Sequence, residues 1–239
     1  MIRALTVAVG LLAGPAFAVT CEDVSFEGLS YSTCTVDPAT ERLELFLYDD
    51  KGDPYGSFVA LEQAYPGKTI SFAMNAGMYQ QDRSPVGYFV QDGTELHDLL
   101  TGASKGNFGM LPNGVLCIRP GQARVFETLV FEQMSSRCEF ATQSGPMLVI
   151  DGALHPRFLP NSTSRFVRNG VGTTDSGDRA IFAISSQPVT FYEFARFFRD
   201  GLGLPLALYF DGNVSQMHAP GLGRSDDGRA MGPIVAVIE

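Results

Sequence analysis

Four short stretches of the sequence place a polar side chain close to a glycine. They are Asn75-Ala-Gly77, Gln143-Ser-Gly145, Arg168-Asn-Gly170 and Asp211-Gly-Asn213. Glycine lets a ligand approach the backbone closely, and the neighbouring amide, guanidinium or carboxylate group can bind it. Each stretch alone is typical of an ordinary turn, where Asn, Asp and Gly are common. The four together, one of them with an arginine, make a shared polar site a fair alternative to four ordinary turns.

The aspartate of this set follows a hydrophobic segment. Residues 206–210 are all apolar, which is typical of a buried strand, and they lead directly into Asp211. We expect this strand to hold Asp211 rigidly at the rim of a sheet, with Gly212 leaving room for a ligand. The alternative is that Asp211 only caps a turn.

Several familiar catalytic motifs are absent from the sequence. It contains neither the zinc-protease pattern His-Glu-x-x-His nor a P-loop, and Ser144 does not lie in a nucleophile elbow. The histidines, His97, His155 and His218, are far apart along the chain. We therefore predict no metal and no other cofactor. A divalent cation bound weakly through oxygen ligands stays open as an alternative.

Residues 1–18 have the pattern of a secretory signal peptide. Arg3 precedes the apolar segment 4–13, and Ala16-Phe17-Ala18 offers the small residues that signal peptidase requires. A membrane span needs about 20 apolar residues, so this segment is too short to be one. We expect cleavage after Ala18, no stable insertion in a membrane, and a periplasmic or secreted protein.

The expected mature chain, residues 19–239, suits one domain with a substantial core. Loss of Arg3 would change the net charge from −9 to −10. Such an acidic chain has no long-range attraction for nucleic acid, which we exclude as a partner. An anionic ligand would have to be held by a local arrangement of donors. The oligomeric state is left open.

Four cysteines remain after cleavage. Three pairings are possible, and an exported protein favours disulfides. We predict Cys21–Cys34 and Cys117–Cys138, because each pair closes a short local loop. A zinc site is the alternative, but no Cys-x-x-Cys spacing supports it.

The elements that must position the polar site are mostly strands. One helix is expected after Thr190, which has capping-box spacing to Glu193, and a shorter one over residues 57–65. Strands without regular βαβ alternation predict an α+β domain with one large mixed, mostly antiparallel sheet and a few helices packed on it. The expected strands are 42–48, 69–74, 86–91, 115–119, 124–131, 147–150, 180–185, 206–210 and 234–238.

The ordered set of motifs resembles the phosphodiester glycosidase family, especially its compact exported bacterial members. The resemblance covers residues 40–238, and the order of the motifs is more specific than any one of them. They are Asn75-Ala-Gly-Met-Tyr79, Ser84-Pro-Val-Gly87, Gly106-Asn-Phe108, Gln143-Ser-Gly-Pro-Met147, Arg168-Asn-Gly-Val-Gly172 and Tyr209-Phe-Asp-Gly212.

The resemblance implies hydrolysis of a sugar 1-phosphodiester, with release of the free sugar. Asp211 would meet the positive charge of an oxocarbenium-like transition state as nucleophile or base. Arg168 would hold two phosphate oxygens with its planar fork. Asp82, in the loop after Asn75, is the candidate for a second carboxylate.

Further residues are expected to bind the substrate. The neutral side chains suit sugar hydroxyls, the glycines give room, and Tyr79 and Tyr88 are candidates for stacking on the sugar. The predicted substrate-binding residues are Asn75, Gly77, Gln143, Ser144, Gly145, Asn169, Gly212, Asn213 and Ser215.

Two other functions fit the same sequence. One is a non-catalytic protein of the cell envelope that binds glycans or phospho-sugars without turnover. The other is a phosphodiesterase that cleaves the P–O bond instead of the C–O bond. Release of free sugar separates the glycosidase from both.

Overall fold

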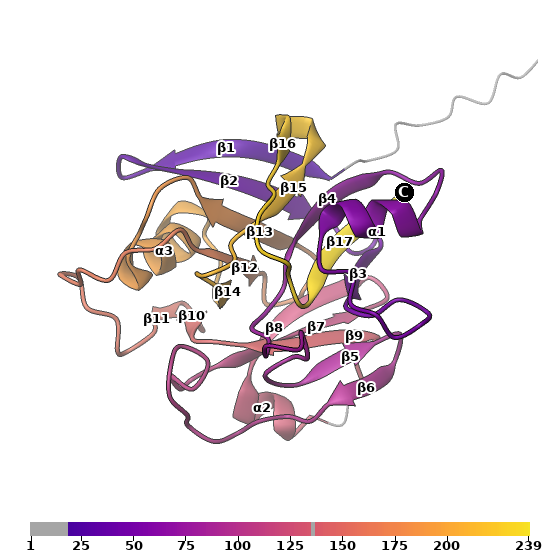
Figure 1. Cartoon of the computed structure of the whole chain (residues 1–239). Coiled ribbons are helices and arrows are strands. Elements are labelled where there is room, and N and C mark those ends of the chain that lie inside the picture. Colours follow the sequence, from indigo (N-terminus) through magenta and orange to yellow (C-terminus); the bar gives the residue numbers. More distant parts are fainter. Residues whose placement is uncertain (1–18, 135–136) are drawn as a thin grey trace, which may run out of the picture.

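The strands of the computed structural model form three sheets, and every strand pair within them is antiparallel (Figure 1). The structure describes residues 19–134 and 137–239, so the expected signal peptide lies outside the described residues. The largest sheet has seven strands. In spatial order they are β1 (Thr20–Phe26), β2 (Leu29–Val36), β13 (Ala180–Ser185), β12 (Asn169–Thr173), β14 (Leu206–Asp211), β10 (Met147–Ile150) and β11 (Ala153–Leu154).

The other two sheets have five strands each. The first consists of β16 (Arg224–Ser225), β15 (Met217–Ala219), β4 (Ile70–Asn75), β17 (Ile234–Ile238) and β3 (Leu43–Phe46). The second consists of β6 (Thr94–His97), β5 (Phe89–Gln91), β9 (Phe140–Ser144), β7 (Gly114–Arg119) and β8 (Gln122–Glu127). It lies below the others in Figure 1.

One hydrophobic core joins the three sheets. It includes Phe72 of β4, Leu116 of β7, and Phe182 and Leu208 of the seven-stranded sheet, all fully buried. The rings of Phe72 and Phe182 lie 4.9 Å apart, centroid to centroid. Burying one such side chain stabilises a fold by about 1.5–3 kcal/mol. The core therefore fixes the sheets against one another and with them the strand ends.

The helices are short and lie outside the sheets. Ser57 caps α1 (Phe58–Ala64) by accepting a hydrogen bond from the Ala60 N–H. The capping box of Thr190 and Glu193 starts α3 (Phe191–Arg196), as the sequence predicts. The remaining helices are α2 (Thr128–Glu132), the π-helical turn η1 (Phe197–Gly201), which continues α3, and the 3₁₀ turn η2 (Pro220–Leu222).

The α+β class is confirmed, with several differences in detail, since β1, β2, β9 and β12 are absent from the expected strands. The strands divide among three sheets instead of forming one. The expected strand 124–131 ends early, because the Glu127 carboxylate accepts a hydrogen bond from the Val130 N–H and begins α2. Both predicted disulfides are present, Cys21–Cys34 between β1 and β2 and Cys117–Cys138 from β7.

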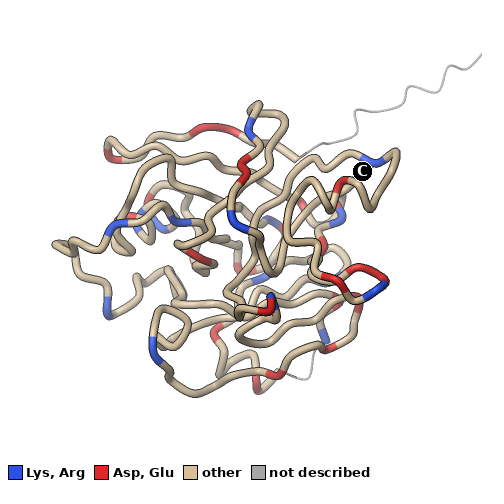
Figure 2. The backbone as a smooth tube through the Cα atoms, in the orientation of Figure 1, with Lys and Arg blue, Asp and Glu red and all other residues tan. Residues whose placement is uncertain are grey.

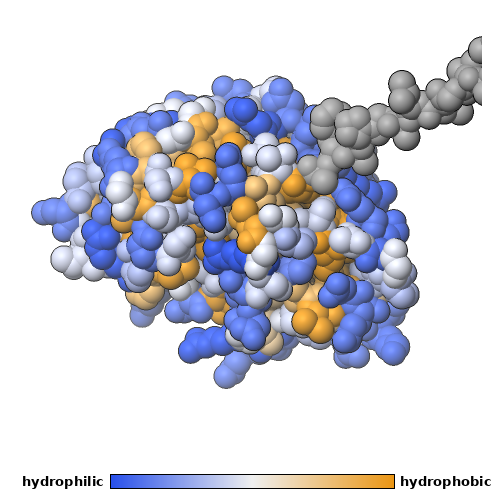
Figure 3. Space-filling view, turned by 90° about the horizontal axis from the view of Figure 1, so that it is seen from above, coloured by the Kyte–Doolittle hydropathy of each residue, from blue (hydrophilic) through white to orange (hydrophobic). Residues whose placement is uncertain are grey.

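Charged and hydrophilic residues are spread widely over the molecule. Acidic and basic residues are scattered over the whole described chain (Figure 2). Seen from above, apolar residues form separate patches among hydrophilic ones (Figure 3). None of the helices in residues 19–134 and 137–239 has the length and apolar character needed to cross a membrane.

Candidate active site

Asp211 is the last residue of β14, as the apolar segment before it predicts. Its Oδ1 atom accepts hydrogen bonds from the backbone N–H groups of Gly212, at 2.6 Å, and Asn213, at 2.9 Å. The other carboxylate oxygen, Oδ2, has no hydrogen-bond partner among the described residues. One oxygen is thus fixed by the backbone, and the other is available to a ligand.

Burial controls the electrostatics of this carboxyl group. Desolvation raises the pKa of Asp211 above its usual range, and the hydrogen bonds from Asn213 and Gly212 oppose that shift. Desolvation disfavours the charged form. The carboxylate therefore gains more from a nearby positive charge than an exposed aspartate would.

Two buried asparagines hold the backbone at Asp211. The Asn169 Oδ1 accepts a hydrogen bond from the Asp211 N–H at 3.0 Å. The Asn169 amide donates in turn to the Asn75 Oδ1, which also accepts from the Gln216 N–H at 2.9 Å. Both asparagines are fully buried, so through these hydrogen bonds they position Asp211 from within the protein. Within the described residues, only the Nδ2 of Asn75 in this network lacks a partner.

A cavity of about 710 Å³ opens beside Asp211. Its volume falls within the range of about 300–1,000 Å³ that is typical of small-molecule sites. Asp211 is its one acidic lining residue among the described residues, and three cationic side chains share the wall. The charged lining residues are Asp211, Arg83, Lys105 and Arg229, and the neutral polar ones include Gln80, Gln81, Ser104, Asn107 and Asn213.

Known proteins resemble this chain in sequence and in fold. The family model described as phosphodiester glycosidase matches residues 68–237. The chain belongs to the phosphodiester glycosidase family. It is also 33% identical over 210 residues to the uncharacterized protein YigE of Escherichia coli (strain K12), covering 87% of this chain and 82% of that protein.

Solved structures share the fold of this phosphodiester glycosidase family member at low sequence identity. The zebrafish N-acetylglucosamine-1-phosphodiester alpha-N-acetylglucosaminidase catalytic domain, auto-inhibited by its pro-peptide, matches with a TM-score of 0.63 and 14% identity, over 92% of this chain and 81% of that one. A protein of Burkholderia pseudomallei K96243 described as exported matches with a TM-score of 0.55 and 12% identity, over 87% and 74%.

Arg168 does not reach the cavity in this family member. Its Nε donates to the Val189 carbonyl at 2.9 Å, its Nη2 donates to the Ser164 carbonyl at 3.2 Å, and its guanidinium lies 3.6 Å over the ring centre of Phe191. Burial lowers the pKa of Arg168, and Tyr209 opposes that shift. Two of the three guanidinium nitrogens thus bind backbone carbonyls, while the buried Nη1 has no hydrogen-bond partner among the described residues.

Gln143 and Ser144, which were expected to bind the substrate, use their polar groups for hydrogen bonds within the protein. The Gln143 Oε1 accepts from the N–H groups of Tyr88 and Leu100, both at 3.0 Å, and its Nε2 donates to the Leu100 carbonyl at 2.6 Å. The Ser144 hydroxyl donates to the Phe210 carbonyl at 3.0 Å. Gly145 packs tightly against Asn113, because a Cβ atom added at position 145 would lie only 2.6 Å from the Asn113 Cβ atom. These three residues hold strands and loops together and do not line the cavity.

Other predicted residues lie near the site without lining the main cavity. Asp82 is exposed outside the wall, and hydrogen bonds from Ser84 lower its pKa. The Ser215 hydroxyl lies 3.0 Å from the backbone carbonyls of Val167 and Asp211 and can donate its one hydrogen to either. Gly77 has a φ of +149°, and a Cβ there would lie 2.8 Å from the Thr142 hydroxyl. Of these three residues, Ser215 is the one that contacts the backbone of Asp211.

Gly212 and the two tyrosines complete the set. A Cβ at position 212 would lie 2.3 Å from the hydroxyl of the buried Tyr209, so only glycine fits there without movement. Tyr79 lines the cavity, with Arg83 stacked 5.3 Å from its ring centre. Tyr88 packs instead against Phe131, with ring centroids 5.5 Å apart. Of the two stacking candidates, only Tyr79 is placed to touch a ligand.

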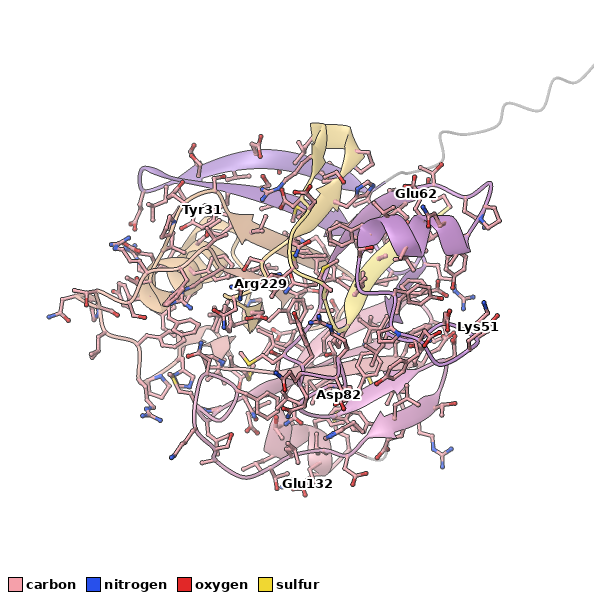
Figure 4. The ribbon with its side chains drawn as sticks, in the orientation of Figure 1. Tyr31, Lys51, Glu62, Asp82, Glu132 and Arg229 are labelled. Carbon is pink, nitrogen blue, oxygen red and sulfur yellow. A yellow bond between two sulfur atoms is a disulfide. The ribbon has the colours of Figure 1, made fainter. Side chains whose placement is uncertain are left out.

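The cationic lining residues were not found by sequence reasoning. Arg229 follows Gly228, and so repeats the pattern of a polar residue beside glycine, and Figure 4 shows it on the connection from β16 to β17. Arg83 directly follows Asp82 in the loop after Asn75. The cavity also takes Ser104 from Gly102-Ala-Ser-Lys-Gly106, which has Gly-x-Ser-x-Gly spacing but lies in a loop and not between a strand and a helix.

No metal centre is evident in the described part of this family member. Over residues 19–134 and 137–239, His, Cys, Asp and Glu side chains do not gather in groups of three that could hold an ion. His155 is buried with its Nδ1 accepting from the Arg157 N–H, and His218 contacts Ser225. Neither lines the cavity at Asp211.

Proposed function

We propose that this protein is an exported hydrolase that cleaves the glycosidic C–O bond of a sugar 1-phosphodiester and releases the free sugar. One observation carries the proposal. A partly buried carboxylate, Asp211, shares a cavity with three cationic side chains and with neutral amides. That combination suits a ligand with both an anionic group and many hydroxyls.

The anionic group of the substrate is a phosphodiester with one negative charge. Arg229 forms no hydrogen bond or ion pair through its side chain with any described residue, and it lies in the cavity wall. Arg83 donates from Nη1 to the Ala230 carbonyl at 2.8 Å and keeps its other nitrogens for a ligand. Guanidinium groups bind phosphate with paired hydrogen bonds. We assign these two arginines, in place of Arg168, to the phosphate.

The chemical step breaks the bond between the anomeric carbon and the phosphate oxygen. The electron pair of that bond leaves with the phosphate, and positive charge develops on the sugar ring. The free Oδ2 of Asp211 meets that charge, which is the interaction that lowers the barrier. Water supplies the oxygen of the new sugar hydroxyl and loses one proton to solvent. The phosphate monoester that leaves is stable as an anion, so the step needs no second carboxylate to protonate it.

The proposed location is the periplasm or the exterior. The predicted secretory signal over residues 1–18 and the two disulfides support it. Disulfides of this kind persist in oxidising compartments. Mass spectrometry of the protein from a periplasmic extract should find Val19 as its first residue.

The test is hydrolysis of a panel of α-linked sugar 1-phosphodiesters in oxygen-18 water. We expect free sugar carrying the label at the anomeric oxygen, and unlabelled phosphate. Label in the phosphate would show P–O cleavage instead. Binding of the panel without release of sugar would support the non-catalytic alternative.

A further inference from the structure

A second cavity adjoins the cavity at Asp211. It has a volume of about 400 Å³, and it shares Arg83, Arg229 and Ala230 with the cavity at Asp211. The two cavities therefore meet at the arginines assigned to the phosphate. A phosphodiester has two substituents, and a phosphate held at this junction would direct one into each cavity.

The shared residues Arg83, Arg229 and Ala230 form a partition between the two cavities, and several hydrogen bonds hold this partition in place. The Ala230 carbonyl accepts hydrogen bonds from the Tyr79 hydroxyl, at 2.7 Å, and from Arg83 Nη1, at 2.8 Å. The Arg229 carbonyl accepts from Gln216 Nε2 at 2.8 Å. The Met231 N–H donates to the Gly56 carbonyl at 2.7 Å, which ties the partition to the loop before α1.

The second cavity differs in chemistry from the first. Tyr55, Phe58 and Val59 form an apolar wall, and the Val59 side chain is 60% exposed. Asp226 and Asp227 also line this cavity, and Asp226 is paired with Arg224 at 2.8 Å. Asp227 has no hydrogen-bond or ion-pair partner among the described residues. An unpaired carboxylate repels a second negative charge.

We infer that this second cavity is the subsite for the aglycone, the alcohol portion that leaves with the phosphate. It accepts an aglycone with an apolar body and no further negative charge, and it disfavours a second phosphate group. This inference rests on the proposed function for the direction of cleavage. The binding of an organic phosphate at the junction, however, can be measured without turnover.

Binding of phenyl phosphate and inorganic phosphate by calorimetry tests the subsite. We expect the wild-type protein to bind phenyl phosphate at least about fivefold more tightly, because its ring buries apolar surface against Val59. Val59→Ser should lower that ratio about threefold and leave inorganic phosphate unchanged. Val130→Ser is the matched control, since Val130 is a similarly exposed valine on α2. It should keep the wild-type ratio.

Turnover gives the second arm of the experiment. A sugar 1-phosphodiester with a phenyl aglycone should have a kcat/KM at least about tenfold above that of a nucleoside diphosphate sugar, which carries a second phosphate. Asp227→Asn removes the charge that repels this phosphate, so it should reduce the ratio of the two kcat/KM values. Equal binding of both phosphates by the wild type, or an unchanged ratio in Val59→Ser, would overturn the subsite. If no substrate releases sugar, the hydrolase proposal fails, while the calorimetry still decides whether the subsite exists.

Discussion

Asn169 and Asp211 face each other across β12 and β14, and the side chain of one binds the backbone of the other at 3.0 Å. The ladder is irregular at this point, since its register shifts between Asn169 and Gly170. An amide side chain thus takes over a contact that a regular ladder would give to a backbone carbonyl. The position of the candidate catalytic carboxylate depends on that amide.

Replacing this amide should misplace the carboxylate. Asn169→Ala leaves the Asp211 N–H buried without its acceptor, which costs about 1–3 kcal/mol of unfolding free energy. We expect kcat to fall about tenfold or more with little change in KM, since geometry and not contact with the substrate is lost. Denaturant melts and steady-state kinetics on the folded fraction measure both effects. Loss of stability with normal kcat would make Asn169 purely structural.

Asp211→Asn should abolish most of the turnover. The variant keeps an oxygen for the Gly212 and Asn213 N–H groups but loses the charge that meets the transition state. Loss of one such preorganised group lowers kcat by about 10²–10³-fold. Asp82→Asn is the comparison, because Asp82 is exposed outside the cavity wall and should keep kcat within about twofold. A stronger effect at Asp82 would restore its assignment as the second carboxylate.

The pH dependence should carry the signature of a buried carboxyl. Burial raises the pKa of Asp211, so the acidic limb of kcat/KM should lie above the ordinary aspartate value of about 3.9. A raised pKa in the folded state also means that ionisation of Asp211 destabilises the fold as pH rises through that pKa. Asp211→Asn should therefore melt at a higher temperature than wild type at neutral pH. Thermal melts of both proteins between pH 4 and pH 7 test this, because the Tm of Asp211→Asn should rise relative to that of wild type as pH increases.

Arg229→Ala should weaken substrate binding without unfolding the protein. Arg229 is exposed, and its side chain makes no hydrogen bond or ion pair within the described chain. Loss of one charge-assisted hydrogen bond to phosphate, about 1.5–3 kcal/mol, should lower kcat/KM about 10–150-fold with an unchanged Tm. Affinity for inorganic phosphate should fall in parallel. An unaltered affinity would remove Arg229 from the phosphate site.

Arg168→Lys should act on stability first. Lysine cannot make both backbone hydrogen bonds or stack on Phe191 as the guanidinium does, so we expect a loss of about 1–3 kcal/mol in unfolding free energy. Turnover per folded molecule should fall less than in Arg229→Ala. The reverse order of effects would show that Arg168 moves to meet the substrate.

The local features of the chain could be predicted from the sequence. The segment 206–210 does end at Asp211, Thr190 and Glu193 do form a capping box, and both disulfides pair within short loops. Each of these depends on residues close together in the chain. Local pattern and short loop closure are enough to specify them.

The direction of side chains could not be predicted in this way. Gln143 and Arg168 are polar residues close to glycines, yet they satisfy buried backbone groups whose positions depend on several sheets. Arg83 and Arg229 face the cavity because loops distant in sequence pack together there. A single sequence shows that buried polar groups need partners, but it does not show which partners the fold brings near.

The three cations of the cavity belong to a chain whose net charge is −9. Fields from surface charges fade over about 10 Å at 0.1 M salt, so the arginines attract an anion only once it has entered. A polyanion, with charges spread along its length, meets the negative exterior first and is repelled. A small diester with one charge is not held back to the same degree. We therefore expect the site to favour short anionic substrates over long anionic polymers.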